Sequence, residues 1–341
     1  MSTYKYLGVV LDEHLSFTQC VNNLSDSACR ALSGIIVKVK DNRDLGLKTF
    51  NKIYESGVQP IMNYGAGIWG NTRTKVFDNV QNRAMRFYLG VHKFAPHPAV
   101  IGDMGWLKPK FALKLCTIRL WNRLLKMSNN RLTKIIFDWD LQNARNNWSY
   151  DMHMLLKEID MESCFINRGE ISINDALSKF LLLNQSEWTH NLLSKPKLRV
   201  YRTFKSELRT ENYIQAYLNK HERSIIAQFR AGILPLRIET GRYTNTKDET
   251  TGKFRKLNVN ERICELCCLN EIEDELHFLL RCPIYNNFRK TLMETCVNIY
   301  PSFKLLNDSD KLIWIMKNSC DKNLAKYLIK SWDLRKSKRF K

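Results

Sequence analysis

The sequence predicts a mainly α-helical protein. Glycine and proline are sparse, with 14 and 8 residues in a chain of 341, so few positions force the backbone to turn. Apolar residues recur at steps of three and four over long segments, which is the period of a helix with one buried face. Hydrophobic residues at 44% and charged residues at 26% are the balance of a folded protein. The length suffices for about two domains.

Four helices are predicted in the first part of the chain. Their apolar faces place them at residues 21–39, 47–58, 77–87 and 109–125. Pro60 ends the second helix, and Pro109 begins the fourth because proline suits the first helical turn. The glycine-rich segment 64–70 between them is expected to be a loop that packs its aromatic residues inward. Further helical segments are expected at 173–184 and 213–229.

The N-terminal residues have a different character. Tyr4–Asp12 is rich in aromatic and β-branched residues and reads as one β-strand. No second strand precedes it, and a single strand does not form a stable sheet. We therefore expect the chain to begin inside a larger domain.

Five segments are expected along the chain. The boundary near residue 129 depends on weaker helical periodicity and on the Asn-rich run 143–147. The segments are a strand at 1–15, a helical domain at 16–128, a linker or variable helical region at 129–190, a basic region at 191–300 that contains a cysteine cluster at 264–285, and a C-terminal helix with a basic tail at 301–341.

The charge points to a polyanionic partner. Lys and Arg number 54 against 34 Asp and Glu, which gives a net charge of +20 and a pI of about 9.5. Between residues 191 and 262 there are 16 basic and 7 acidic residues. RNA or DNA is the expected partner, although a merely basic protein or one that touches an anionic membrane surface has the same composition. No apolar run of about 20 residues and no secretory signal is present, so the protein is expected to be intracellular, cytoplasmic or nuclear, without a membrane partner.

The cysteines predict a zinc site. Disulfides do not persist in the cytosol or nucleus, and six of the ten cysteines are scattered among apolar residues as small hydrophobic side chains. The spacing Cys264-x2-Cys267-x9-His277-x4-Cys282 is that of a Cys3His zinc knuckle. Four protein ligands leave no position for water, so a structural Zn²⁺ is expected and Cys268 is a spare thiol. The alternative is a chance cluster of buried thiols.

Several segments resemble one known family. LPLRIETGRY at Leu234–Tyr243, ERICELC at Glu261–Cys267 and IEDELHFLLRCPIY at Ile272–Tyr285 are similar to the C-terminal region of reverse transcriptases of non-LTR (LINE-type) retrotransposons. YLGVVLD at Tyr6–Asp12 resembles the strand that closes their palm. The thumb-like matches are Ile53-Tyr54, Tyr64-Gly65, Trp69-Gly70, QNRAMR at Gln81–Arg86 and Leu89–Val91.

The resemblance implies part of an RNA-directed DNA polymerase. It implies a palm-end strand, a helical thumb bundle and a second helical domain with a zinc knuckle. The catalytic carboxylates of the family lie upstream of the matching strand, and no Asp-Asp pair occurs in this sequence. Asp138-Trp-Asp140 is the segment most similar to the Asp-Asp motif. Mg²⁺ is therefore expected only if the chain is joined to a palm, and by itself the chain is expected to be inactive as an enzyme.

Nucleic-acid contacts are expected on both sides of the knuckle. The stretch Glu271–Leu276 is acidic and unsuited to phosphates, so its flanks are better candidates. Instead of contacting nucleic acid, the basic tail at 335–341 could equally be a nuclear-import patch or a solvated terminus. An Arg near Glu239 could equally form an ion pair with that carboxylate. The candidates are Arg237, Arg242, Tyr243, Arg255, Lys256, Arg262, Arg335, Lys336, Lys338 and Arg339.

Two other readings remain open. The chain could be a non-enzymatic or domesticated interaction module whose knuckle binds protein, which the acidic stretch would permit. It could also be the truncated product of an active polymerase gene.

The sequence lacks a P-loop pattern, His-Glu-x-x-His and Gly-x-Ser-x-Gly, which disfavours NTPases, metalloproteases of that type and serine hydrolases.

Overall fold

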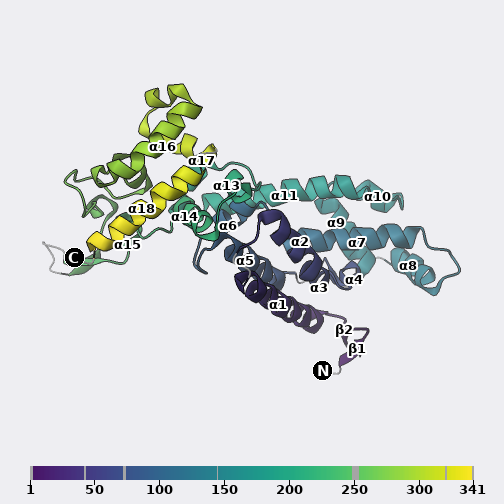
Figure 1. The fold of residues 1–341 in the computed structure, drawn as a ribbon. Helices are drawn as coiled ribbons and strands as arrows, with labels where there is room; N and C mark the ends of the chain where they lie inside the picture. The colour runs from purple at the N-terminus through teal and green to yellow at the C-terminus, as the bar shows by residue number, and fades with distance from the viewer. Residues whose placement is uncertain are drawn as a thin grey trace. The chain divides into compact units, whose positions relative to one another are not determined.

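The computed structural model describes residues 3–41, 44–71, 74–143, 145–247, 253–318 and 321–339. It is mainly helical, as the sequence predicts, with two small two-stranded sheets among the described residues (Figure 1). The chain divides into two compact units. Unit 1 comprises Met1–Ala84 and Trp106–Trp188, and unit 2 comprises Met85–Gly105 and Thr189–Lys341. This division differs from the five segments expected from the sequence.

Unit 1 begins with a β-hairpin where one strand was predicted. Strands β1 (Thr3–Tyr6) and β2 (Val9–Asp12) pair antiparallel, with Tyr6 opposite Val9. The two turn residues, Leu7 and Gly8, have φ values of 45° and 88°, as the mirror-image turn of a tight hairpin requires. The prediction of a single unpaired strand was therefore wrong, because Gly8 lets the segment fold back and pair with itself.

The predicted helices of unit 1 are confirmed. Helix α1 buries Cys20, Val21, Ala28, Leu32 and Val39. The glycine-rich segment is a loop with one short helix in it. It buries Trp69 as expected, but Tyr64 is 46% exposed, so the expectation that its aromatic residues pack inward was wrong for Tyr64. The helices are α1 (Thr18–Asp41), α2 (Leu47–Gly57), α3 (Gln59–Met62), α4 (Ala66–Trp69), α5 (Val76–Leu89, which continues into unit 2) and α7 (Pro109–Leu125).

Residues 129–190, expected to be a linker or variable helical region, supply most of the buried residues of a hydrophobic core. Trp121 of α7 packs edge-on against Phe137, with ring centroids 5.5 Å apart, and is stacked with Phe165 at 5.4 Å. Met152, Phe180 and further apolar residues close the same cluster. The helices are α8 (Leu132–Gln142), α9 (Trp148–Glu158), α10 (Glu162–Ile166) and α11 (Ile173–Leu193).

The Asp138-Trp-Asp140 segment has a structural role. Asp140 accepts hydrogen bonds from the backbone N–H of Ser149 at 3.0 Å and from its hydroxyl at 2.5 Å, which tie α8 to the first turn of α9. Asp138 forms an ion pair with Lys134 one helical turn earlier, at 3.1 Å. Both carboxylates therefore have partners within their own helix pair.

Unit 2 is built from short helices and one further hairpin. The segment predicted as one helix at 213–229 forms two, α13 and α14, because Asn219 caps the second with a capping box to Glu222. The elements are α6 (His97–Met104), η1 (Pro196–Leu198), α12 (Tyr201–Phe204), α13 (Asn212–Gln215), α14 (Lys220–Arg230), α15 (Arg237–Thr240), β3 (Asn245–Lys247), β4 (Phe254–Lys256), η2 (Val259–Glu261), η3 (His277–Arg281), η4 (Pro283–Tyr285), α16 (Asn286–Ile299), η5 (Pro301–Leu305), α17 (Asp308–Lys317) and α18 (Asp321–Arg339).

A buried ionic cluster joins four segments of unit 2. Arg230, at the end of α14, contacts Asp103 of α6 at 3.1 Å and Glu211 at 2.6 Å. It also donates to the carbonyl oxygen of Met316 in α17 at 2.8 Å. The hydroxyls of Tyr201 and Tyr213 donate to Asp103 at 2.8 and 2.7 Å.

In the described part of the chain, no helix combines the length and hydropathy needed to cross a bilayer.

Asp321 near this cluster makes stability depend on pH. Burial raises the pKa of its carboxyl from 3.8 to about 6, while Arg230 opposes the rise and Glu211 adds to it. The folded chain holds a proton that the unfolded chain releases, so this stabilisation is present below about pH 4 and lost as pH rises through about 6. We expect the melting temperature of Asp321→Asn, relative to wild type, to increase between those pH values and then level off. Asp333→Asn, which alters an exposed carboxylate of the same helix, is the control. A constant difference across the range would contradict the assignment.

Candidate metal centre

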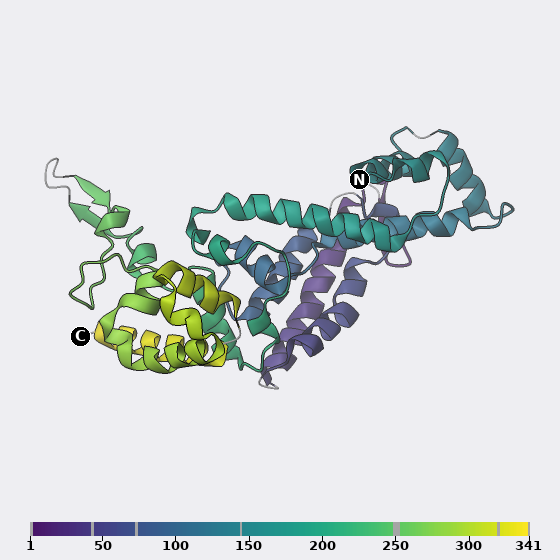
Figure 2. The ribbon, with the colours of Figure 1, turned by 90° about the horizontal axis from the view of Figure 1, so that it is seen from above.

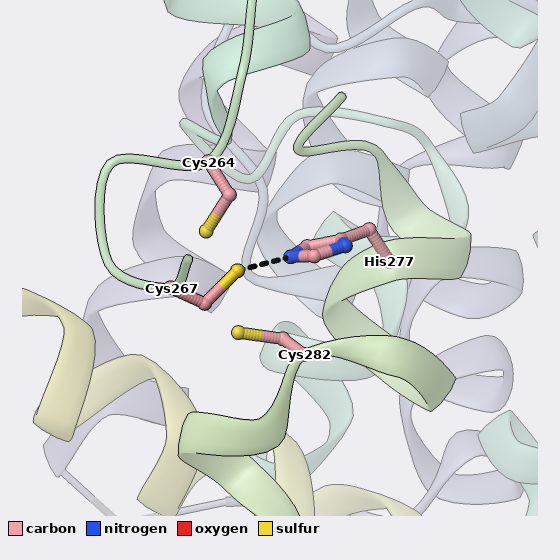
Figure 3. A group of neighbouring side chains, drawn as sticks. All are labelled: Cys264, Cys267, His277 and Cys282. Atoms are coloured by element: carbon pink, nitrogen blue, oxygen red, sulfur yellow. Dashed lines mark hydrogen bonds between the residues drawn. The ribbon is translucent and has the colours of Figure 1, made fainter. Parts of the chain in front are cut away.

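Four side chains in unit 2 converge on one point. The ligand atoms of Cys264, Cys267, His277 and Cys282 all lie within 4.8 Å of one another (Figure 3). The Sγ atom of Cys267 is 3.4 Å from Nε2 of His277. Zinc–ligand bonds of about 2.0–2.3 Å in a tetrahedron place the ligand atoms roughly 3.5–3.8 Å apart, so the arrangement is close to that of a metal site.

Two local structures bring the ligands together. Ile263 and Ile272 form an isolated antiparallel bridge, in which the N–H of Cys264 donates to the carbonyl of Glu271 at 2.9 Å. The chain turns between them and presents Cys264 and Cys267 on one side. The helical turn η3 then carries His277, and the N–H of Cys282 donates back to the carbonyl of His277 at 2.8 Å. The second pair of ligands is thus set by one short helical turn.

A carboxylate orients the histidine. Nδ1 of His277 lies 3.0 Å from Oε2 of Glu271, which leaves Nε2 facing the three sulfurs. The backbone N–H of His277 also donates to Asp274 at 2.8 Å. Metal-bound histidines commonly give their other ring nitrogen to a carboxylate, which sets the tautomer and strengthens the ligand. The acidic stretch of the knuckle therefore has a role in the centre itself.

The sulfurs form an interacting pair. Hydrogen bonding with Cys282 lowers the pKa of Cys264, and the same interaction raises the pKa of Cys282. One thiolate is thus stabilised even among protein groups alone. A metal cation needs thiolate ligands and favours the remaining deprotonations.

The donor set fits a closed site. Three sulfurs and one imidazole nitrogen are ligands for a soft or borderline cation such as zinc, and three of the four residues are buried. Cys268 is exposed and lies outside the group, as predicted. The cluster can therefore hold a metal ion such as zinc, and its four protein ligands are typical of a structural site.

The knuckle is tied into unit 2 through Glu273. This carboxylate is buried and accepts from the backbone N–H of Arg237 at 2.7 Å and from Arg335 of α18 at 2.5 Å. Its own backbone carbonyl accepts from the N–H of Ile238 at 3.1 Å. Arg335 is only 3% exposed and bonded to Glu273, so the prediction that it contacts nucleic acid was wrong, and so was the alternative of a solvated terminus at this residue.

Most of the other predicted contact residues have protein partners. Arg237 pairs with Glu265 at 3.0 Å, Arg242 with Glu239 at 3.1 Å, and Lys336 with Asp333 at 2.8 Å. Arg255 forms a two-pronged pair with Glu261 at 2.7 and 2.5 Å. Arg262 donates to the backbone carbonyls of Ile238 and Leu257. Lys338 is exposed on α18, and Arg339 is the last residue of that helix.

The β3–β4 hairpin presents a basic and aromatic surface. Tyr243 and Phe254 are each 78% exposed, and Lys247 and Lys256 are exposed beside them. Lys247 is opposite Phe254 in the ladder, and Nζ of Lys256 lies 5.9 Å from the Tyr243 ring centre. We call these four residues the hairpin face. In Figure 2 the two strands are the green arrows that extend away from α16–α18.

Sequence reasoning identified half of the hairpin face. Tyr243 and Lys256 were predicted, whereas Lys247 and Phe254 were missed. The alternation Tyr243-x-Asn245-x-Lys247 and Phe254-x-Lys256 is the period of a strand and could have placed these side chains on one face. Neither lysine has an ion-pair partner within the described residues.

Comparison of the chain with protein-family models, with curated proteins and with solved structures finds no match. The geometry of the centre and of its surroundings is therefore the basis for the functional argument.

Proposed function

We propose that the chain is a zinc-stabilised protein that binds single-stranded RNA or DNA through the hairpin face. Zn²⁺ would bind Cys264, Cys267, His277 and Cys282 and would act as a structural cross-link. It supplies no reaction step here, because four protein ligands leave no open position for a substrate. The proposed role is binding and not catalysis.

The observation that carries the proposal is the hairpin face. Two exposed aromatic rings next to two lysines that have no ion-pair partner among the described residues are suited to stack bases and to neutralise phosphates. Large apolar rings cost free energy when they remain in water, so a partner that covers Tyr243 and Phe254 gains from their burial. The net charge of +20 favours a polyanion as that partner.

The centre would hold the hairpin in place. Helix α15 is bonded to the knuckle through Glu273, and it leads directly into Tyr243 and β3. On the far side, β4 leads through η2 into Cys264. Metal binding in the knuckle would therefore order both ends of the hairpin. This gives the metal a role in nucleic-acid binding without any contact to the ligand.

The resemblance to LINE-type reverse transcriptases gives the proposal a biological setting. On that reading the chain is the thumb and knuckle portion of an RNA-directed DNA polymerase and holds template or target strands for a palm on the same polypeptide. The segments that carry the resemblance include Leu234–Tyr243, which leads into the hairpin, and Glu261–Cys267 and Ile272–Tyr285, which contain the four ligands.

A binding assay tests the hairpin face. We expect Tyr243→Ala and Phe254→Ala each to weaken binding of a fluorescently labelled 16-nucleotide single strand by about 5- to 150-fold, because stacking on one aromatic ring contributes roughly 1–3 kcal/mol. Replacing Lys256 with Ala should reduce the slope of log affinity against log salt by about 0.7. Fluorescence anisotropy over a series of salt concentrations measures both effects.

The matched control is Phe94→Ala. Phe94 is 77% exposed and has the Lys93 ammonium 5.0 Å from its ring centre, so it resembles the hairpin pairs but lies elsewhere in unit 2. This variant should bind as wild type does. An equal loss for Phe94→Ala and Phe254→Ala would show that binding is diffuse, and an affinity that is flat between low and moderate salt would reject nucleic acid as the ligand.

A further inference from the structure

A hollow lies in unit 2, and none of its lining residues belongs to the hairpin face. It has a volume of about 670 Å³ and is bounded by α16, η5 and the first turn of α17. Its apolar lining comes from Met293 and Val297, one turn apart on α16, and from Phe303 of η5. Phe303 is buried, so its ring forms part of the floor and offers no free face to a ligand.

The charged lining of the hollow is mostly positive. Lys290, Lys304 and Lys311 line it, against Glu294 as the acidic member. The three lysines come from three different elements, and none has an ion-pair partner in the part of the chain that the structure describes. Three ammonium groups around an apolar floor are complementary to a ligand that carries both carboxylates and hydrophobic side chains.

Exposed hydrophobic residues adjoin the hollow in the chain. Leu305, the residue after Lys304, is 88% exposed, and Ile299 at the end of α16 is more than half exposed. Methionine in the floor adds a flexible apolar surface that adapts to different side chains. Apolar surface of this kind beside a concavity is typical of a site that binds an amphipathic helix.

We propose that this hollow binds an acidic amphipathic peptide segment of a partner protein. Apolar side chains of the segment pack against Met293 and Val297, over the floor to which the buried Phe303 contributes, and its carboxylates pair with Lys290, Lys304 and Lys311. A nucleic acid fits the hollow less well, because its phosphates would lie over an apolar floor that has no exposed ring for stacking. The inference does not depend on the proposed nucleic-acid binding.

A designed probe tests the proposal. The probe is a fluorescein-labelled 14-residue peptide of Glu, Ala and Leu, with leucines spaced three and four apart so that they form one face of a helix. We expect saturable binding, weakened about 10-fold or more in Lys304→Glu/Lys311→Glu, because each reversal replaces an attraction by a repulsion. Val297→Glu should weaken it by a similar factor, because it places a charge in the floor.

The control variant is Lys326→Glu/Lys330→Glu on α18, which makes the same change in net charge outside the lining of the hollow. It should reduce peptide binding far less than the variant in the hollow. A second peptide with alanine in place of leucine should bind at least 10-fold more weakly. Thermal unfolding of each variant shows that it is folded before the affinities are compared.

Three results would overturn the proposal. They are no binding of the leucine peptide at millimolar concentration, equal losses in both double variants, and equal affinity for the alanine peptide. A labelled single strand provides the remaining arm of the test. If Lys304→Glu/Lys311→Glu weakened the binding of this nucleic-acid strand much more than the control variant did, the hollow would be a nucleic-acid surface and the peptide assignment would be wrong.

Discussion

The Cys282→Ser variant is expected to lose its bound metal and, with it, the order of the segment from α15 to η4. Wild-type protein should carry about one zinc ion per chain, as expected for a single four-ligand site. A serine hydroxyl is a poor zinc ligand, so three donors would remain at a site that needs four. Structural zinc in small finger peptides contributes roughly 10–16 kcal/mol of apparent binding free energy, which makes this the largest expected effect of any single change.

The loss of order at the metal centre should extend to the segments that are bonded to the knuckle. Glu273 lies within the knuckle and is bonded to Arg237 and Arg335, so disorder at the centre also leaves these two groups without their buried partner. Hydrogen exchange should therefore increase at α15, at the hairpin and at the C-terminal end of α18. If the chain binds nucleic acid through the hairpin face as proposed, that binding should fall together with the zinc content, because both ends of the hairpin lead into segments bonded to or part of the knuckle.

Metal analysis and hydrogen exchange measure this result, with Cys268→Ser as the matched control. Cys268 is one residue from a ligand but is exposed and outside the cluster, so its variant should keep one zinc ion and the wild-type exchange pattern. A Cys282→Ser protein that retained a full equivalent of tightly bound zinc, with unchanged exchange in the knuckle, would contradict the assigned ligand set.

Replacing Arg230 by Met is expected to produce the second largest effect. The guanidinium is buried and contacts Asp103, Glu211 and the carbonyl of Met316. Burial opposes its charge, but Asp103 and Glu211 more than compensate and keep the pKa of Arg230 above its ordinary value. Removing the cation leaves a buried Asp103 carboxylate without its ionic partner, which costs about 3–5 kcal/mol.

The magnitude follows from the number of segments that meet at this side chain. Asp103 belongs to α6, Arg230 to α14 and Met316 to α17, while Glu211 precedes α13. The Tyr201 and Tyr213 hydroxyls that donate to Asp103 would remain, so the loss should be partial in the neighbourhood of α6. We expect a lower denaturant midpoint and a melting transition lowered by several degrees.

Urea unfolding monitored by circular dichroism checks the prediction. Arg209→Ala is the control, because that arginine is largely exposed and pairs with an exposed Glu207, so it should change stability by less than about 1 kcal/mol. The double variant Asp103→Asn/Arg230→Met should recover part of the loss, since it removes the unpaired charge. If Arg230→Met alone cost no more than Arg209→Ala, the cluster would not be a stabilising feature.

The sequence by itself determined the elements with strong local signals. The period of three and four apolar residues located α1, α2, α5 and α7, and Pro109 correctly marked the start of α7. The ligand set of the centre was also determined locally, because the two pairs Cys264–Cys267 and His277–Cys282 each lie on one short turn. These features depend on neighbours in the chain, which the sequence displays directly.

Only the tertiary structure decided which charged groups are free. Arg335 was predicted to contact nucleic acid and is buried against Glu273, a partner 62 residues away in the chain. Gly8 converted a predicted strand into a hairpin, and residues 129–190 became a core against α7. Ion pairs and packing contacts of this kind join residues that are far apart in the chain, and no local sequence pattern shows that they are close in space. Composition therefore gives the net charge of +20 but not which of the charged side chains are exposed on the surface.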